Sequence, residues 1–532
     1  MKNLLLLFIL CFALNLSAQN HHQRFSELDI QHYKFELSLP EKNNQISGTA
    51  NIYFQVKKPI ETFYLDLFRS NNKGMTVKSA KIDAECIDFS QKNNQLHIQS
   101  KIKLQPKKLY KLTVNYEGTP VDGLIIGKNK FGDRTFFGDN WPNRAHHWLP
   151  TVDHPSDKAT VEFLVEADAR YQVVGTGKKL EETTLPSGRR LTHWKTDVQL
   201  PTKVMVIGAA EFAVELAGEV DDIPVTSWVF PENKKEGFYD YAPAVKVLDW
   251  FHTHVAPYPY EKLANVQSKT RYGGMENASN IFYFENSVTG KREREGLIAH
   301  EIAHQWFGNS ASEADWHHVW LSEGFATYFT HLYFEHQYGR EKFVDGLQTD
   351  RTGIIRYARQ NPNSPIVDTS IEDYNQVLST NTYQKASWVL HMLRQKIGTE
   401  TFWEGIRAYY QKYQLDNALT DDFKNVMEQI SDQKLDDFFQ QWIFTPGVPK
   451  LEIDWSYDAG TKMVDIAIEQ TSATKHSFPL EIELSNKDGL SLGKGTAEVK
   501  AGKITLSIPA EAKPGRLLLD PETKVLFSAV IR

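Results

Sequence analysis

The sequence predicts a multidomain α+β protein in which β-rich regions flank a mainly helical one. The chain has 532 residues, which is too long for one typical domain. Near both ends its apolar residues recur with a period of two, as in strands, and between them with a helical period. Apolar residues make up 41% and charged residues 24%, a balance typical of soluble globular proteins.

Residues 1–18 are predicted to be a secretory signal peptide. A basic residue precedes an apolar run from Leu4 to Leu14, and a short stretch of small residues ends at Ala18. The run is too short to span a bilayer, so no stable membrane anchor is expected. We therefore expect an exported protein, located in the periplasm or, alternatively, secreted. Cleavage would leave Cys86 as the only cysteine, which excludes an intramolecular disulfide.

Residues 19–215 are predicted to form a β-rich N-terminal domain. The segments 33–39 and 110–116 place apolar side chains at every second position. Turn-forming sequences such as "NNKG", "GTP" and "PSG" separate such runs. Short alternating runs between turns are typical of antiparallel sheets.

Residues 216–445 are predicted to be mainly helical. In the segment "TDDFKNVMEQI", residues Phe423, Val426 and Met427 fall on one helical face, and Thr420 is the expected N-cap. A strand-rich patch interrupts the helical pattern near 263–285.

Residues 446–532 return to a period of two after "FTPGVPK". Apolar residues alternate in the segments 464–468, 480–484 and 504–508. Some eighty residues with this pattern predict a small β-sandwich.

The stretch "HEIAHQWFGN" contains two histidines, His300 and His304, four residues apart. On an α-helix this spacing puts both imidazoles on one face, where both can reach one zinc ion at about 2.1 Å. Glu301 is rotated by roughly 100° from His300, which places it beside the metal without ligating it. A histidine pair on a helix is also common without a metal, so a third ligand has to decide.

Glu323 is the candidate third ligand. It follows His304 after eighteen intervening residues, which allows one helix to end and a second to return past the metal. Its surroundings, "WLSEGFATYF", are apolar, and a carboxylate on a buried face needs a partner such as a cation. Two histidines and one glutamate leave an open position on a tetrahedral zinc ion, as catalytic sites require.

Together these motifs resemble the M1 family of zinc aminopeptidases, the gluzincins. The stretch "YGGMENASN" is similar to the family's G-x-M-E-N motif, and "WLPTVDHPSDKATVEF" resembles its N-domain segment. The resemblance covers nearly all of the expected mature chain. It implies a thermolysin-like catalytic domain at 216–445 and a short, bacterial-type architecture without the large helical C-terminal domain of many members.

The resemblance also implies a function, a zinc metallo-aminopeptidase that hydrolyses the N-terminal bond of peptides. His300, His304 and Glu323 would hold one Zn²⁺ per chain. Glu301 would act as general base toward a zinc-activated water and then protonate the leaving amine. Glu276 would bind the free α-amino group of the substrate, which restricts cleavage to the N-terminus.

Further substrate-binding and catalytic residues follow from the same motifs. The residues around Glu276 expected to bind substrate are Gly273, Gly274, Met275 and Asn277. The two glycines would let a peptide approach the backbone as an added strand. Tyr383 would donate a hydrogen bond to the oxyanion, although Ala386 stands where the family often has glycine.

One position of the family's amine site stays open. Members usually have a glutamine in the N-domain that helps to bind the amine, and Asp139 or Asn140 in "FFGDNWPN" falls near its place. An aspartate would add a second anion to the site, whereas an ordinary turn is the alternative.

Two other functions are alternatives. One is a non-catalytic peptide-binding protein on the same fold, against which the intact Glu301 and Tyr383 argue. The other is a bifunctional epoxide hydrolase and aminopeptidase. The net charge of −7 provides no basic surface for nucleic acid, so peptides are the expected partners. The sequence fixes neither the preferred N-terminal residue nor the oligomeric state.

Overall fold

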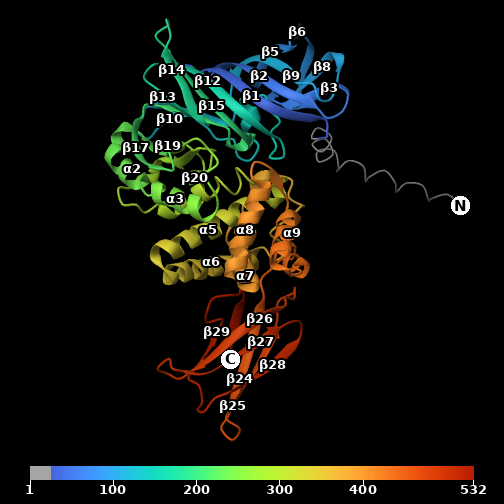
Figure 1. Cartoon of the computed structure of the whole chain (residues 1–532), viewed down its shortest axis with the longest axis vertical. Helices are drawn as coiled ribbons and strands as arrows, with labels where there is room; N and C mark the ends of the chain where they lie inside the picture. The colour runs from blue at the N-terminus through green and yellow to red at the C-terminus, as the bar shows by residue number, and fades with distance from the viewer. Residues whose placement is uncertain (1–25) are drawn as a thin grey trace, which may run out of the picture. The chain divides into compact units, whose positions relative to one another are not determined.

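The computed structural model describes residues 26–532, and the predicted signal peptide at 1–18 lies outside the described residues. The chain forms two compact units (Figure 1). The first comprises the described part of Met1–Asp249, Tyr258–Gln305 and Leu415–Asn417, and the second comprises Trp250–Pro257, Trp306–Gln414 and Ala418–Arg532. Strands dominate the N-terminal part, helices the middle and strands the C-terminal part, which confirms the predicted α+β class. The predicted domain boundaries stay predictions.

A large sheet builds the N-terminal part, with strand order β14-β15-β12-β1-β2-β9-β5-β4 and β6 paired to β5. Its strands are β1 (Leu28–Ser38), β2 (Ile46–Val56), β4 (Arg69–Ser70), β5 (Lys73–Ile82), β6 (Glu85–Cys86), β9 (Tyr110–Thr119), β12 (Lys158–Ala167), β14 (Lys178–Thr184) and β15 (Arg190–Pro201). The predicted alternation is confirmed, because Tyr33, Phe35 and Leu37 of β1 are buried while residues between them are partly exposed.

The pairing of β1 with β12 differs from the antiparallel arrangement that the sequence predicts. His32–Ser38 runs parallel to Thr160–Glu166, whereas β1 and β2 are antiparallel. No hairpin joins β1 to β12, and only a long connection allows two strands of one sheet to run in the same direction. Alternation reveals a strand but not its partner, so the sequence could not indicate this pair.

Two smaller sheets complete the N-terminal part, with strand orders β3-β8-β7 and β10-β11-β16-β13. Their strands are β3 (Ile60–Asp66), β7 (Asp88–Lys92), β8 (Gln95–Leu104), β10 (Leu124–Lys128), β11 (Arg134–Gly138), β13 (Gln172–Gly175) and β16 (Ile207–Ala210).

A five-stranded sheet, β17-β18-β19-β21-β20, lies in the same unit and positions part of the candidate site. Its strands are β17 (Ala213–Val220), β18 (Ile223–Val229), β19 (Leu263–Ser268), β20 (Gly274–Met275) and β21 (Asn280–Phe284), and the helices α2 (Lys234–Tyr241), α3 (Ala244–His254) and α4 (Glu295–Ala303) belong to the same stretch of chain. This confirms the strand-rich patch expected near 263–285. The short strand β20 is at the edge of the sheet, so one of its sides has no neighbouring strand.

The second unit contains the longer helices. They are α5 (Trp320–Tyr338), α6 (Arg340–Gln360), α7 (Ala386–Ile397), α8 (Thr399–Tyr413), α9 (Thr420–Ser431) and α10 (Asp436–Phe439), with π-helical turns η7 (Asn381–Lys385) and η8 (Gln440–Phe444). Buried aromatic side chains pack between these helices, and Phe325 of α5 contacts Phe329, Tyr409 and Phe423. None of the helices described between residues 26 and 532 combines the length and apolar composition that a membrane crossing requires.

The N-terminus of α9 differs from the prediction, because Leu419 and not Thr420 is the N-cap residue. The Thr420 hydroxyl instead accepts a hydrogen bond from Trp320 Nε1 at 2.8 Å and contacts His318 Nδ1 at 2.8 Å. Asp422 takes over the capping role, since its carboxylate accepts the N–H of Leu419 at 2.8 Å. The Thr420 side chain, which the local pattern predicts as the helix cap, thus bonds to Trp320 and contacts His318 instead.

The C-terminal strands form two sheets, β28-β25-β24-β30 and β27-β26-β29 (Figure 1), as expected of the predicted sandwich. Their strands are β24 (Lys450–Asp458), β25 (Met463–Gln470), β26 (Phe478–Ser485), β27 (Ser491–Val499), β28 (Lys503–Pro509), β29 (Arg516–Leu519) and β30 (Ser528–Ile531). Polar contacts tie this part to the helices of the same unit, because Arg351 of α6 pairs with Asp520 at 2.8 Å.

Helices α5 and α7 approach closely at Gly324. A Cβ atom added to Gly324 would lie 2.5 Å from the Cβ of Ala386, the first residue of α7. Only one residue of this facing pair can therefore have a side chain. Glycine at position 324 of α5 makes room for the side chain of Ala386. Ala386 itself stands where the family named in the sequence analysis often has glycine.

We expect Gly324→Ala to lower the thermal midpoint of unfolding, because the added methyl overpacks the α5–α7 contact at a cost of about 1–3 kcal/mol. Adding Ala386→Gly should recover much of the loss, since it removes the facing methyl. Gly353→Ala in α6 is the control: nothing lies within 4 Å of its added Cβ, so it should be neutral or stabilising. Equal losses in the single and double variants would contradict the contact.

Candidate active site

Helix α4 presents the two histidines. Its buried face consists of small and aliphatic residues, with Ile298, Ala299 and Ile302 almost fully buried, while charged residues precede it. His304 is the C-cap residue but keeps helical angles of φ −59° and ψ −23°. Its N–H bonds to the carbonyl of His300 at 3.3 Å, so both imidazoles project from one face as predicted.

The two imidazoles face each other through their Nε2 atoms, which are 3.1 Å apart. The ring planes are nearly perpendicular at 83°, and His304 is 1% exposed. Two nitrogens bound to one tetrahedral zinc at about 2.1 Å would be separated by about 3.4 Å. The observed Nε2–Nε2 distance of 3.1 Å is close to this separation, so a cation bound by both nitrogens fits their geometry.

Glu323 lies in the first turn of α5 and is 4% exposed. A carboxylate at a helix N-terminus is stabilised by the unpaired N–H groups there. Its helix packs through large aromatic residues, which removes the carboxylate from bulk water and raises the cost of its charge. This environment favours a bound cation.

The ligand atoms of His300, His304 and Glu323 all lie within 4.8 Å of one another. Within residues 26–532 no other group of three histidine, cysteine or acidic side chains has this proximity. Two nitrogens and one carboxylate oxygen match the donor set of catalytic zinc sites and leave an open position. The predicted cluster is therefore present.

Glu301 lies on α4 beside the strand β20. It is 4% exposed, and a methyl group added at Gly274 would overlap its carboxyl group. The absence of a side chain at position 274 therefore leaves room for Glu301. Gly274 is also a predicted substrate contact, so its approach to Glu301 is a second reason for glycine at this position.

Glu276 follows the edge strand β20 and is 5% exposed. Strand β20 pairs with β21 in antiparallel register, Gly274 opposite Tyr283 and Met275 opposite Phe282. The Met275 and Asn277 side chains are buried, whereas Gly273 is exposed. Among the predicted substrate-binding residues 273–277, the exposed Gly273 is therefore the one whose backbone an incoming peptide can reach directly.

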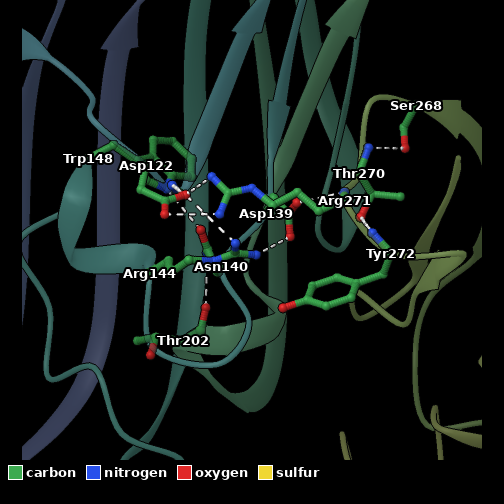
Figure 2. A network of polar contacts seen from close by, with 11 residues as sticks. Asp122, Asp139, Asn140, Arg144, Trp148, Thr202, Ser268, Thr270, Arg271 and Tyr272 are labelled. Carbon is green, nitrogen blue, oxygen red and sulfur yellow. Dashed lines mark hydrogen bonds and ion pairs between the residues drawn. The ribbon is translucent and has the colours of Figure 1, made fainter. Parts of the chain in front are cut away.

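Asp139 is at the position where the sequence left a role in amine binding open, and it is fully buried in an ion-paired network (Figure 2). Its carboxylate pairs with Arg144 at 2.6 Å and accepts the backbone N–H of Arg271 at 3.1 Å. Burial raises the pKa of the Asp139 carboxyl group, and Arg144 opposes that shift. Asp139 is therefore not an uncompensated second anion.

Asn140 is committed to the fold. Its amide donates to the carbonyls of Thr202 at 3.1 Å and Met205 at 2.7 Å, and its oxygen accepts from Trp148 Nε1 at 2.9 Å (Figure 2). Both amide protons are thus used, and Asn140 has no donor left for a ligand.

The same network anchors the segment that leads to Glu276. The Arg271 guanidinium forms a two-pronged ion pair with Asp122, and Arg144 lies 5.6 Å from the centre of the Tyr272 ring (Figure 2). Burial raises the pKa of Tyr272 to about 12, so its hydroxyl stays protonated at neutral pH. The sequence does not indicate this network, because Arg271 lies 132 residues from Asp139 and 149 residues from Asp122 and no local pattern links them.

Tyr383 lies in the π-helical turn η7 and is half-buried. Its N–H bonds to the carbonyl of Ser379 at 3.1 Å. Single π-helical turns inside helical segments are rare and occur often at functional sites. The close approach at Gly324 sets η7 and α7 against the turn of α5 that follows Glu323.

Two domain families match the chain. The Peptidase M1 N-terminal domain matches residues 30–204, and the Peptidase family M1 domain matches residues 239–442. The second range includes the described site elements α4, α5 and η7.

Proteins with curated names are similar over most of this chain. Probable aminopeptidase 2 of Sulfurisphaera tokodaii is 25% identical over 79% of this chain and 54% of its own length. Glutamyl aminopeptidase of Sus scrofa is 24% identical over 80% of this chain and 48% of its own length. Leucyl aminopeptidase of Saccharolobus solfataricus is 22% identical over 86% and 59%. The chain thus spans about half the length of the curated relatives it matches.

We expect purified protein to bind about one Zn²⁺ per chain, because three ligands and one open position define a single site. Glu323→Ala should lose most of the metal, as two imidazoles alone bind it weakly. Glu335→Ala, on the same helix but paired with Arg340, should keep it. Metal content measured by atomic spectroscopy after dialysis checks this, and full occupancy in Glu323→Ala would remove Glu323 from the ligand set.

Proposed function

The chain belongs to the peptidase M1 family, and on that premise we propose that it is a zinc-dependent aminopeptidase. The proposed reaction is hydrolysis of the first peptide bond of a peptide with a free N-terminus. The observation that supports it most is the cluster of His300, His304 and Glu323. Relatives named as aminopeptidases agree with it.

The proposed metal site is formed by these three residues. A zinc ion bound there would supply Lewis-acid chemistry, lowering the pKa of water and polarising the scissile carbonyl. The residues around the site have to do the rest: move protons, hold the substrate and stabilise the developing charge.

Glu301 is the proposed proton carrier. It follows His300 directly but is rotated away from the ligand face, so it would accept a proton from the attacking water without ligating the metal. It then delivers that proton to the amine that leaves. Its 4% exposure keeps bulk water away from the carboxyl group. The hydroxyl of Tyr383 is the proposed hydrogen-bond donor to the oxyanion.

Glu276 is the proposed anchor for the α-ammonium group. Before this residue, the charges of Asp122, Asp139, Arg144 and Arg271 pair with one another. The Glu276 carboxylate is the negative charge proposed to meet the substrate ammonium. A charge-assisted bond in a buried position is stronger than an exposed one and fixes which peptide bond can react.

The free side of β20 is the proposed docking edge for the substrate backbone. An edge strand offers unpaired N–H and C=O groups, and a peptide can extend the sheet by pairing with them. The exposed Gly273 lets a second backbone approach, because a Cβ added there has only Leu297 nearby, at 3.8 Å.

Replacing the proposed base should separate chemistry from metal binding. Glu301→Gln should keep zinc and lower kcat by roughly 10²- to 10⁴-fold, the usual contribution of a positioned acid–base group. Gly274→Ala should act in the same direction with metal content unchanged, because the added methyl displaces the Glu301 carboxyl group. Near-normal kcat in Glu301→Gln would contradict its role as base.

Replacing the proposed anchor should remove the preference for a free amine. Glu276→Ala should keep zinc but lower kcat/KM on aminoacyl substrates by roughly 2–4 kcal/mol of transition-state binding. The loss should disappear on N-acetylated substrates, which have no ammonium group. Glu293→Ala, an exposed glutamate paired with Lys291, is the control and should behave as wild type. Equal losses on free and acetylated substrates would exclude Glu276 as the anchor.

A further inference from the structure

Gln305 is the residue that follows His304 at the end of α4, and its side chain is 0% exposed. Nothing in the metal or acid–base chemistry needs an amide here. Its side-chain nitrogen nevertheless donates to the backbone carbonyl of Glu276 at 2.8 Å. Its side-chain oxygen accepts the backbone N–H of Ser279 at 2.9 Å.

The two bonds bracket one tight turn. Asn280 N–H bonds to the carbonyl of Asn277 at 2.9 Å, which closes a four-residue turn directly after Glu276. The Gln305 amide meets the carbonyl just before this turn and an N–H inside it. Its nitrogen also contacts the carbonyl of Glu301 at 3.4 Å, so one side chain joins the turn to α4.

The turn is held from its other side as well. Lys262 Nζ, itself buried, donates to the carbonyl of Ser279 at 3.1 Å and also to the side chain of Asn280. Ser279 has a left-handed φ of 61°, and its hydroxyl accepts the N–H of Gly177 at 3.0 Å. With so many contacts the turn has little freedom of its own, and the Gln305 side chain bonds it to α4.

We infer that Gln305 is a positioning residue that sets the separation between the amine anchor and the residues of α4 that act on the peptide bond. The inference rests on the proposed function, in which Glu276 binds the ammonium and Glu301 moves the proton. An aminopeptidase cuts one residue from the end only if this separation matches one residue. The Gln305 amide fixes it by bonding to the backbone of Glu276 from a residue adjacent to His304.

Gln267 provides a matched control within the same unit. It is also a glutamine with 0% exposure, and its oxygen accepts the N–H of Phe230 at 3.0 Å. Its nitrogen donates to Asn233 Oδ1 and to the carbonyl of Glu285, both at 2.8 Å. These bonds are equal in kind and similar in number but reach neither the turn after Glu276 nor α4. Loss of either amide leaves buried backbone groups unpaired, so both substitutions should lower stability.

The experiment compares Gln305→Glu and Gln305→Met with the same two changes at Gln267. Glutamate keeps the acceptor for Ser279 but turns the donor toward Glu276 into a second acceptor, and methionine removes both. In the Gln305 variants kcat on free-amine substrates should fall roughly 10²-fold with little change in KM, because the amine still binds but the bond lies out of register. The Gln267 variants should keep wild-type kcat and KM. All four should retain one zinc per chain.

A double variant distinguishes a positioning role of Gln305 from a purely structural one. In a Glu276→Ala background the amine is no longer anchored, so adding Gln305→Glu should cause little further loss. Fully additive losses, wild-type kcat in Gln305→Glu, or loss of zinc from it would each overturn the inference. So would misfolding of both Gln305 variants while the Gln267 pair folds. If wild-type enzyme cuts free and acetylated substrates equally, the proposed function itself fails, a result distinct from these.

Discussion

Burial of charge is the constraint on which the rest of this molecule's candidate site depends. Glu276, Glu301 and Glu323 are each exposed by only 4–5%, and His304 by 1%. Removing a carboxylate from water is costly unless an opposite charge or several hydrogen bonds compensate it. In the proposed function, a cation at the His300–His304–Glu323 cluster and a substrate ammonium at Glu276 would add compensation of this kind. Glu301 has the same low exposure directly beside this cluster.

Two glycines, which have no side chain, make room for these buried groups. Gly274 is where β20 passes the carboxyl group of Glu301, and Gly324 is where α5 meets Ala386 at the start of α7. At each point a single methyl would separate two elements, and the candidate site residues Glu301 of α4 and Glu323 of α5 lie on two of them. Close packing transmits such a displacement because protein interiors have few voids to absorb it. Glycine at these two positions is therefore a condition for the site geometry as well as for the fold.

The sequence predicted what depends on local spacing. The i, i+4 histidine pair, the neighbouring Glu301 and the alternation in β1 follow from helical and strand periods, and the structure reproduces them. It did not predict the parallel partner of β1 or the contacts of Arg271 with Asp122 and Asp139, because these join segments far apart in the chain. Thr420 shows a third case, in which a residue suited to a helix cap is used by His318 and Trp320 instead. Local propensity is a weak prior that tertiary contacts override.

In the proposed function, exopeptidase specificity is a property of the distance between the amine anchor and the reacting groups. An ammonium anchor and a metal site could each sit on flexible segments and still bind their ligands, but the cut would then fall at a variable bond. The turn after Glu276 is instead fixed by Lys262 on one side and Gln305 on the other. Gln305 is covalently adjacent to His304 and its amide bonds to this turn, so it links α4 to the proposed anchor. Rigid coupling of two weakly selective contacts is enough to select one bond, since only a substrate that satisfies both at once places its first peptide bond at the reacting groups.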